Sequence, residues 1–517
     1  MVGHDVAPWL FGDNRRVHRG LPRHQFTERK LHYHLFVYFF RQAIDLLRTN
    51  GLTSYISSSS WLRANYAISL RGFLRRETTI DLLVDLGDNK VFVDAPDLYP
   101  AIHLVRNKAP LLGYKARAAI FERGAKVEDF DYELSKRIFE LSILDQIDEV
   151  WQLERDDQRK LLDKLSIADS TLDTLAAGQM YVGIKTALND VFVIDSNLQK
   201  AQFSKEQYSE FIKPVLAGAD LRPWYQAYAG EYVIAIPAGW TTARYGNKSH
   251  RMSEEDAWKC LGEEYPELVT YLTPYIVSGR QRQDKGEYWW ELRPCAYYDA
   301  FTKPKIMWPD ITKFPRFSWD ETGYYLGNTG YILITEAKWL LAYLNSRCAW
   351  YLISKLSIAL GERAGLQRYR LIDQYMRPLP VPNVPVHQQT KLADLADGLT
   401  NAANARFQLH QEIRHRISSD LGSPDLKLNE KLTNWWEHDF ATFRAEVKRV
   451  FKRDIPLSER SDWERYLTDA RKKHEAYTAE IVRMETELNA IVYGLFDLTS
   501  AEIKIIEEST KYKYGEM

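Results

Sequence analysis

An alternation of helical and strand-like patterns between Leu31 and Val105 constrains the fold of this 517-residue chain most strongly. Apolar residues recur at helical spacing from Leu35 to Leu47 and again from Leu62 to Leu74. Three further apolar runs are expected to be strands: Leu52–Ser57, Ile80–Leu86 and Ala101–Val105. The order helix, strand, helix, strand, loop, strand predicts one half of an α/β sheet. Residues 1–30 are expected to form a loose basic leader, too short to supply the other half.

Composition places the chain among globular proteins, with 45% hydrophobic and 27% charged residues. Its length suggests roughly three domains of about 100–200 residues each. No apolar run approaches the roughly 18–20 residues of a membrane span, and the N-terminus has no apolar signal-peptide core, so we expect a cytoplasmic protein. The scattered cysteines Cys260, Cys295 and Cys348 predict neither a disulfide framework nor a zinc site.

The charge is balanced overall but uneven along the chain. The formal net charge is −1, whereas residues 279–316 carry eight Lys and Arg against five Asp and Glu, interleaved with aromatic residues. A local basic and aromatic surface is compatible with DNA binding, because phosphate contacts are local. It is equally compatible with an ordinary core under a solvated surface.

The expected secondary structure and the residue composition change several times after the first segment. Residues 31–110 are expected to form the partial α/β unit and residues 111–178 a helical connector, with helices near Leu134–Ile147 and Gln158–Leu165. Residues 179–386 have short strands, frequent Gly and Pro and one long helix at Lys338–Leu356, which predicts a β-rich domain. Residues 387–517 are expected to be helical, with a coiled-coil-like seam from Trp463 to Leu495 and a capping box at Thr499 and Glu502.

The first segment resembles a known enzyme family. YFFRQAIDLLRTNG, SSSSWLRANYAISLRGFL and VFVDAPDLYPAIHLV look like the adenine-N6 DNA methyltransferases of Eco57I-like type IIG restriction–modification enzymes. The resemblance implies the C-terminal half of a class I methyltransferase sheet, with Leu52–Ser57 as its fifth strand and the two later runs as a hairpin. The fold class is then α/β followed by a mixed β-rich domain and a C-terminal helical region. Within the first unit, Ser59 or Ser60 is expected to cap the second helix.

The resemblance continues into the β-rich domain. YVGIKTALNDVFVID looks like the opening of a TaqI-like target-recognition domain, and the family motif is matched at five positions: Gly183, Thr186, Asn189, Asp190 and Phe192. The sequence departs from the motif at Ala187, where the family usually has glycine. The segments IKPVLAGADLRPW, KPKIMWPDI and YLNSRCAWYLIS also fit this recognition region.

Three parts of the family plan are not found in the sequence: a Gly-rich cofactor motif after a strand, an (N/D)PP(Y/F) tetrapeptide and a nuclease domain. In the family the tetrapeptide accepts hydrogen bonds from the adenine amino group and stacks on the flipped base. The resemblance implies S-adenosylmethionine for the complete enzyme, but we expect this chain alone to bind no cofactor and to transfer no methyl group. No catalytic residue and no metal site is predicted.

Candidate binding residues follow from the resemblance and from residue chemistry. Phe92 lies where the family places an aromatic against the flipped adenine; an equally weighted alternative is that it belongs to the hairpin core. Arg and Gln read base edges by paired hydrogen bonds, so Arg363, Gln367, Arg368 and Arg370 are candidate DNA contacts, with a solvated loop as the alternative. Four further residues are candidate contacts to the DNA backbone: Arg280, Arg282, Lys303 and Lys305.

Two hypotheses about function result. The first is a sequence-specific DNA-binding part of an adenine-specific methyltransferase, whose partners are double-stranded DNA and a catalytic methyltransferase subunit. Because Leu52–Ser57 would lack its usual neighbour, its edge would be exposed and would favour such a partner or self-association. The second hypothesis is a non-enzymatic protein-interaction module or a degenerate gene fragment.

Overall fold

The structure is a computed structural model that describes residues 36–87, 89, 91–92, 99–121, 129–148, 150–151, 153, 155–168, 170–246, 252–422 and 427–515. The predicted basic leader, residues 1–30, lies outside these residues. The chain divides into two compact units, residues 1–163 and 164–517, and helix α4 (Asp156–Ser166) crosses the boundary. Each unit is described by itself below.

The first unit contains a five-stranded sheet with the order β1-β3-β2-β4-β5. Its elements are α1 (Phe36–Asp45), β1 (Leu52–Ser58), α2 (Ile68–Glu77), β2 (Thr79–Asp85), β3 (Pro100–Arg106), β4 (Ala116–Ile120), α3 (Phe130–Arg137) and β5 (Phe139–Leu141). Strand β3 runs antiparallel to both of its neighbours, β1 and β2, and β2 runs parallel to β4. The predicted hairpin is therefore confirmed as the pair β2 and β3.

Strand β1 lies at the edge of this sheet. Among the described strands it pairs with β3 alone, from Leu52 opposite Arg106 to Ser58 opposite Pro100. Leu52 and Ile56 are each 44% exposed, which is unusual for apolar residues of a strand. The exposed edge expected for this strand is thus present in the described part of the unit.

Three expectations that concern the first unit differ from the structure. The interval 111–178, predicted to be a helical connector, contains β4 and β5, which extend the first sheet. The helix expected at Leu134–Ile147 is wrong, because α3 ends at Arg137 and Phe139–Leu141 pairs with β4. The cap also differs: Ser58 caps a short 3₁₀ turn by accepting from the Ser60 backbone N–H (3.3 Å), and α2 has no side-chain cap.

The second unit begins with a β-rich region. Its strands are β6 (Ser170–Thr171), β7 (Met180–Val182), β8 (Val193–Asp195), β9 (Ile212–Leu216), β10 (Glu231–Ile234), β11 (Lys305–Pro309), β12 (Ile311–Thr312), β13 (Ser318–Asp320), β14 (Tyr325–Leu326), β15 (Gly330–Ile334), β16 (Ala359–Arg363), β17 (Leu366–Arg370) and β18 (Pro380–Val381). They form two four-stranded sheets, β14-β9-β10-β8 and β13-β11-β15-β7, with smaller sheets β12-β17-β16 and β18-β6.

Helices surround these sheets. They are α5 (Leu172–Ala176), α6 (Asn189–Phe192), α7 (Ser196–Gln202), α8 (Trp240–Tyr245), α9 (Glu254–Glu264), α10 (Pro266–Leu272), α11 (Ile276–Gln281), α12 (Lys338–Leu344), α13 (Arg347–Leu356) and α14 (Asp373–Met376). The long helix expected at Lys338–Leu356 is divided into α12 and α13, because Ser346 adopts an extended conformation and caps α13. One apolar core, rich in Trp and Tyr, joins the first of the two four-stranded sheets to the helices around Trp289 and Trp290.

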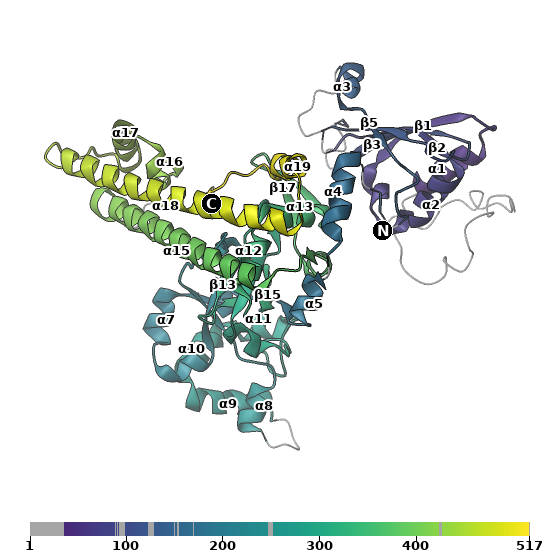
Figure 1. The fold of residues 1–517 in the computed structure, drawn as a ribbon. Coiled ribbons are helices and arrows are strands. Elements are labelled where there is room, and N and C mark those ends of the chain that lie inside the picture. The colour runs from purple at the N-terminus through teal and green to yellow at the C-terminus, as the bar shows by residue number, and fades with distance from the viewer. Residues whose placement is uncertain are drawn as a thin grey trace. The chain divides into compact units, whose positions relative to one another are not determined.

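The last part of the chain is helical, as predicted. Two long helices, α15 (Val386–Arg416) and α18 (Arg460–Leu495), run side by side, with α16 (Glu430–Thr433) and α17 (Phe440–Phe451) at one end (Figure 1). The predicted seam is buried at Trp463, Leu467 and Leu488 among others. The capping box is confirmed at Thr499 and Glu502, at the start of α19 (Ser500–Thr510). None of the helices in the described part of the chain has the length and hydropathy that a membrane span requires.

Candidate nucleic-acid interface

Strands β16 and β17 form a hairpin at the segment of candidate DNA contacts for which a solvated loop was the alternative. The register pairs Glu362 with Gln367 and Arg363 with Leu366. The two turn residues, Ala364 and Gly365, have φ values of 53° and 74°. Positive φ at both central positions is typical of the tight two-residue turn whose twist matches that of paired strands. The sequence Ala-Gly thus ends β16 and begins β17 without a longer loop.

The hairpin places three arginines on one face. Directly paired residues of antiparallel strands share a face, and alternate residues of one strand share a face, so Arg363, Arg368 and Arg370 lie on the same side. Gln367 lies on the opposite side with Tyr369, whose ring meets Trp350 of α13 edge-on (5.7 Å between centroids). The structure therefore brings the three arginines together and separates Gln367 from them.

The arginines differ in how freely they can reach a ligand. Arg363 is exposed and has no ion pair with any described residue. Arg370 is 49% exposed and lies 3.4 Å from the carboxylate of Asp310. Arg368 is half-buried and donates to the Leu360 carbonyl (2.9 Å), so it braces the hairpin. Arg363 and Arg370 are the two guanidinium groups best placed to meet DNA.

Two of the four predicted backbone contacts lie on the surface. Arg280, at the end of α11, is 60% exposed and pairs with Glu254 (2.7 Å), a surface ion pair of small energetic worth. Lys303 is exposed, just before β11. Both side chains remain candidates for contacts with phosphate groups.

Arg282 lies in the core of the β-rich region. Its guanidinium donates to the carbonyls of Thr186 (2.5 Å), Trp289 (2.8 Å) and Glu291 (2.6 Å) and lies 4.1 Å from the ring centre of Phe192. The side chain is 5% exposed, and burial lowers the pKa of the guanidinium to about 10. We therefore remove Arg282 from the candidate DNA contacts, because its donors are used inside the protein.

Lys305, the first residue of β11, is fully buried. Its ammonium group donates to the carboxylate of Asp320 and to the carbonyl of Phe301. Burial lowers the pKa of Lys305, although the Asp320 carboxylate opposes that shift. A buried lysine persists only when it is paired, and this pair links β11 to β13. Lys305 is likewise removed from the candidate DNA contacts.

The family motif of residues 183–192 contacts Arg282 through the carbonyl of Thr186 and the ring of Phe192. Gly183 lies against the backbone that directly follows β14: an added Cβ would fall 2.1 Å from the Gly327 carbonyl oxygen. The buried Thr186 hydroxyl donates to the side-chain oxygen of Asn189 and accepts from the Leu188 backbone N–H (3.3 Å). Ala187 adopts φ 54°, the left-handed conformation that explains why the family usually has glycine there. Phe192 is fully buried, whereas Asp190 is exposed.

Phe92 lies between β2 and β3 in the first unit. Its side chain is 36% exposed, while the preceding Val91 packs against the small core around Val84 and Phe121. The exposure fits a ring available for stacking better than a ring enclosed in the hairpin core. The residues on either side of this short segment lie outside the described part of the chain.

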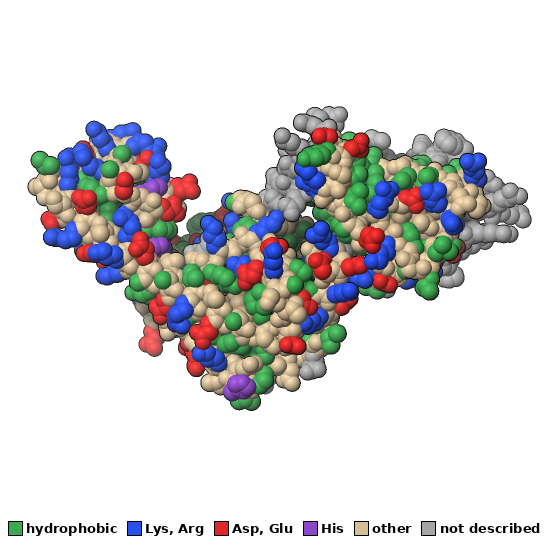
Figure 2. Space-filling view, turned by 45° about the horizontal axis from the view of Figure 1, so that its top comes forward, with side chains coloured by type: hydrophobic (Ala, Val, Ile, Leu, Met, Phe, Trp, Pro, Cys, Tyr) green, Lys and Arg blue, Asp and Glu red, His purple; other side chains and the backbone are tan. Residues whose placement is uncertain are grey.

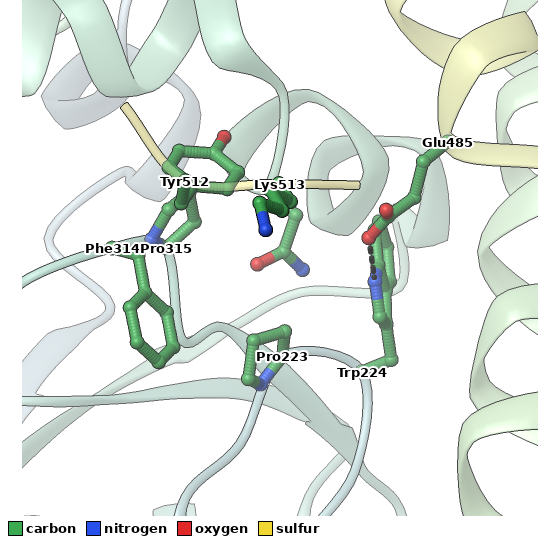
Figure 3. Close-up of a pocket in the computed structure, with 8 residues that line it drawn as sticks. Pro223, Trp224, Phe314, Pro315, Glu485, Tyr512 and Lys513 are labelled. Atoms are coloured by element: carbon green, nitrogen blue, oxygen red, sulfur yellow. Dashed lines mark hydrogen bonds between the residues drawn. The ribbon is translucent and has the colours of Figure 1, made fainter. Parts of the chain in front are cut away.

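Sequence reasoning missed the junction between the β-rich region and the long helices. Trp224 donates its indole N–H to Glu485 of α18 (3.1 Å) (Figure 3). The other carboxylate oxygen of Glu485 accepts from the Gly515 backbone N–H (2.8 Å). Burial raises the pKa of Glu485. Trp224 has φ 74°, which is unusual for so large a residue. The only sequence signal was the segment ending in Arg222-Pro223-Trp224, which the family resemblance included.

The hollow beside this junction is too small to bind a substrate. It is lined by Pro223, Phe314, Pro315, Asn345, Tyr512 and Lys513 in addition to the bonded pair, and has a volume of about 10 Å³ (Figure 3). That volume admits at most one water molecule. The junction therefore joins the β-rich region to the long helices, and its hollow is too small to be a ligand site.

Comparison with known families assigns most of the chain. Residues 13–92 match the Eco57I restriction-modification methylase family, and residues 213–381 match the TaqI-like C-terminal specificity domain. Residues 385–492 match a domain of unknown function, DUF8810. The chain is a homologue of type II DNA methyltransferases. The resemblance inferred from the sequence motifs is thus confirmed, and the match to the methylase family begins inside the segment predicted as a leader.

Individual relatives agree with these families. The type II methyltransferase M.XhoI of Xanthomonas vasicola is 24% identical over 401 residues, which are 73% of this chain and 68% of that protein. M.BstVI of Geobacillus stearothermophilus is 21% identical over 375 residues, or 68% of this chain and 61% of that protein. Among solved structures, the type IIL restriction-modification enzyme MmeI in complex with DNA has a TM-score of 0.38 at 11% identity, covering 86% of this chain and 52% of that chain. This chain thus spans only part of the length of the proteins that it resembles.

Proposed function

We propose that this chain binds duplex DNA and selects the sequence at which an adenine is methylated at N6. The match of residues 213–381 to a TaqI-like specificity domain carries the proposal, supported by the homology to type II methyltransferases. The arginine face of the β16–β17 hairpin supplies the chemistry that such a domain needs. Because its substrate would be cellular DNA, we also propose that the protein acts in the cytoplasm.

The hairpin suits the major groove of DNA. That groove is about 12 Å wide and admits a two-stranded β-ribbon, and an arginine that reaches it can bond both acceptors of a guanine. We assign this role to Arg363 and Arg370, the most exposed guanidinium groups of the face. Arg280 and Lys303 would contact phosphates and so contribute affinity without selecting a sequence. Gln367, on the opposite face, is the weaker candidate for base contact.

The proposal that adenine is the methylated base depends on features of the first unit. Three strands of its sheet, in the order β1-β3-β2 with the middle strand antiparallel to both neighbours, support the proposal that this unit is the second half of a class I methyltransferase sheet. The partly exposed Phe92 would stack on the flipped adenine, an interaction worth roughly 1–3 kcal/mol per base. The sequence contains no (N/D)PP(Y/F) tetrapeptide to hold the amino group.

We propose that this chain alone binds no S-adenosylmethionine. The end of β1 leads into a 3₁₀ turn that Ser58 caps, and Trp61 and Leu62 of this turn are buried. No Gly-rich turn follows any described strand of the first unit. We therefore propose that a separate methyltransferase component binds the cofactor and pairs with the edge of β1, where Leu52, Tyr55 and Ile56 are exposed.

DNA selection and salt titration test the binding function. The purified chain is incubated with a random duplex library, and the retained sequences are compared with the input. We expect one enriched sequence, and affinity that falls by orders of magnitude as salt rises. Failure to bind any duplex at low salt would refute the proposal and favour a protein-interaction module.

A hairpin variant tests the assignment of specificity. Arg363→Gln with Arg370→Gln should lower affinity for the enriched sequence by about 10-fold or more, while binding to unrelated DNA changes much less. Arg483→Gln, an exposed arginine of α18 whose ion pair with Glu487 is also on the surface, is the matched control and should bind both DNAs normally. Equal losses on both DNAs would show that the hairpin contacts only phosphates.

Methyl transfer tests the need for a partner. With S-adenosylmethionine and the enriched duplex, the chain alone should transfer no methyl group. Robust turnover by the chain alone would refute the requirement for a catalytic component without affecting the proposal of DNA binding.

A further inference from the structure

Helix α17 carries a concentration of positive charge. Between Phe440 and Arg453 the only acidic residue is Glu446, whereas five residues are basic: Arg444, Lys448, Arg449, Lys452 and Arg453. The acids Glu437 and Asp439 precede the helix, so the cations gather toward its C-terminal end. Figure 2 shows Lys and Arg side chains crowded on the lobe that α16 and α17 form at the end of the long helices.

The opposite side of α17 is fixed to the long helices. Phe443 and Val447 are buried in a core that includes Leu467, and Phe443 stacks near Trp463 of α18 (6.3 Å between ring centres). This packing sets the direction of the polar face. Lys448 is exposed on the helix, and Lys452, which directly follows the last helical residue Phe451 with φ 59°, is exposed as well.

The acids near this face are already neutralised. Glu446 pairs with Arg449 (2.6 Å) and Lys431 (3.3 Å), and its hydrogen bonds to these cations and to Asn429 hold its pKa down at about 2. Asp454 pairs with Arg444 (2.6 Å) and with Arg460. Within the described residues, Lys448 and Lys452 have no acidic partner. These two lysines, one on α17 and one directly after its end, therefore carry positive charge that no described acidic residue pairs with.

We propose that the C-terminal end of α17 binds the phosphate backbone of duplex DNA outside the recognition sequence. Exposed lysines without acidic partners at the end of a fixed helix match a polyanion, and binding would release counterions from the DNA. The inference rests on the proposed function, and it gives a role to the helical domain of residues 385–492.

The length of α18 indicates how far from the hairpin the end of α17 would contact phosphates of the DNA. Asn489 of α18 accepts a hydrogen bond from the backbone N–H of Arg347 (2.8 Å), at the start of the helix α13 that packs against the hairpin. From Asn489 to Trp463, where α17 packs, α18 extends for roughly 40 Å at about 1.5 Å per residue. One turn of B-DNA is about 34–36 Å long. The helix end would thus meet phosphates about one turn from the hairpin.

The test combines a charge change with a change in DNA length. Lys448→Gln with Lys452→Gln is compared with the unchanged chain on duplexes that extend about 5 or about 25 base pairs beyond the selected sequence on each side. The unchanged chain should bind the longer duplex roughly 10-fold or more tightly, and the variant should lose this gain. The slope of log affinity against log salt should fall by about 2 on the longer duplex only.

A matched variant and a folding measurement complete the test. Lys391→Gln with Lys504→Gln removes two exposed lysines elsewhere on the helical part (53% and 74% exposed) and should leave the length dependence intact. Thermal unfolding of all variants should agree, since none of these side chains is buried. If the Lys448/Lys452 variant keeps the length gain and the salt slope of the unchanged chain, the inference is wrong, and an acidic protein surface becomes the alternative partner. If the unchanged chain binds no DNA, the proposed function itself fails.

Discussion

Arg282→Lys keeps the positive charge at position 282 but removes the planar guanidinium. In the folded chain that group donates three hydrogen bonds to carbonyls on two segments, one to Thr186 and two to Trp289 and Glu291, and lies over the ring of Phe192. Lysine has a single ammonium group on a flexible stem, so it can reach one of these segments but not both. The substitution therefore distinguishes a structural brace from a phosphate contact, for which lysine is an adequate replacement.

The magnitude follows from the contacts that are lost. A hydrogen bond from a charged donor contributes about 1.5–3 kcal/mol, and two of the three are expected to disappear, leaving buried carbonyls without donors. The cation–π contact with Phe192 adds about 0.5–2 kcal/mol. Together these terms give an expected loss of roughly 3.5–8 kcal/mol in the free energy of unfolding. Because a domain typically has only about 5–15 kcal/mol in total, the recognition region would be close to unfolding.

Urea unfolding followed by tryptophan fluorescence measures this loss, since Trp289 and Trp290 lie in the same core as Arg282. The unfolding midpoint of Arg282→Lys should fall by about 1 M or more at a typical slope of about 1–3 kcal/mol per molar urea. Arg280→Lys, two residues earlier and 60% exposed, is the control and should not shift the midpoint. An unchanged midpoint for Arg282→Lys, together with weakened DNA binding, would refute the assignment of Arg282 to the core.

Three further substitutions test local features. Ala187→Gly should raise the free energy of unfolding by about 0.5–1 kcal/mol in the same urea assay, because φ 54° is strained for alanine. Gly183→Ala should destabilise strongly, since its Cβ would meet the Gly327 carbonyl oxygen at 2.1 Å, whereas Gly494→Ala in open space on α18 should not destabilise. His103 is fully buried and burial lowers its pKa to about 3, so the stability given by the neutral ring is complete above pH 6.5 and is lost as pH falls toward 3. Between pH 7 and pH 5 the first unit should lose about 2 kcal/mol, and His103→Phe should remove that part of the pH dependence of thermal unfolding.

The elements that the sequence predicted well are those with a strong local pattern. Helix α1, strands β1 to β3 and the seam of α18 all have unambiguous apolar spacing, and the pairing of β2 with β3 follows from their short separation. The wrong helix at Leu134–Ile147 arose because α3 and β5 are adjacent and short. Phe139, Leu141 and Ile143 alternate at a period of two, which is a strand signal too brief to outweigh the helical residues before it.

Strands β4 and β5 could not have been placed in the first sheet from local signals. Ala116–Ile120 contains mostly small residues, and it becomes a strand by pairing in parallel with β2, which lies more than thirty residues earlier. Such a pairing depends on distant partners and not on the propensity of the segment itself. The hairpin β16–β17 was not predicted, although alternating residues flank the Ala364-Gly365 turn.

The environment of each residue also explains which of the predicted DNA contacts remain candidates in the structure. Lys305 is followed directly by Ile-Met-Trp, and the whole of β11 is buried, so its cation must be paired inside the protein, as it is with Asp320. Arg282 precedes the aromatic run Tyr288-Trp289-Trp290 and is buried with it. Arg363 and Arg370, by contrast, alternate with other residues beside a tight turn, which leaves one face of the ribbon polar. A count of Lys and Arg does not distinguish these four residues. The burial of the neighbouring residues does: it identifies Lys305 and Arg282 as structural and leaves Arg363 and Arg370 as candidate DNA contacts.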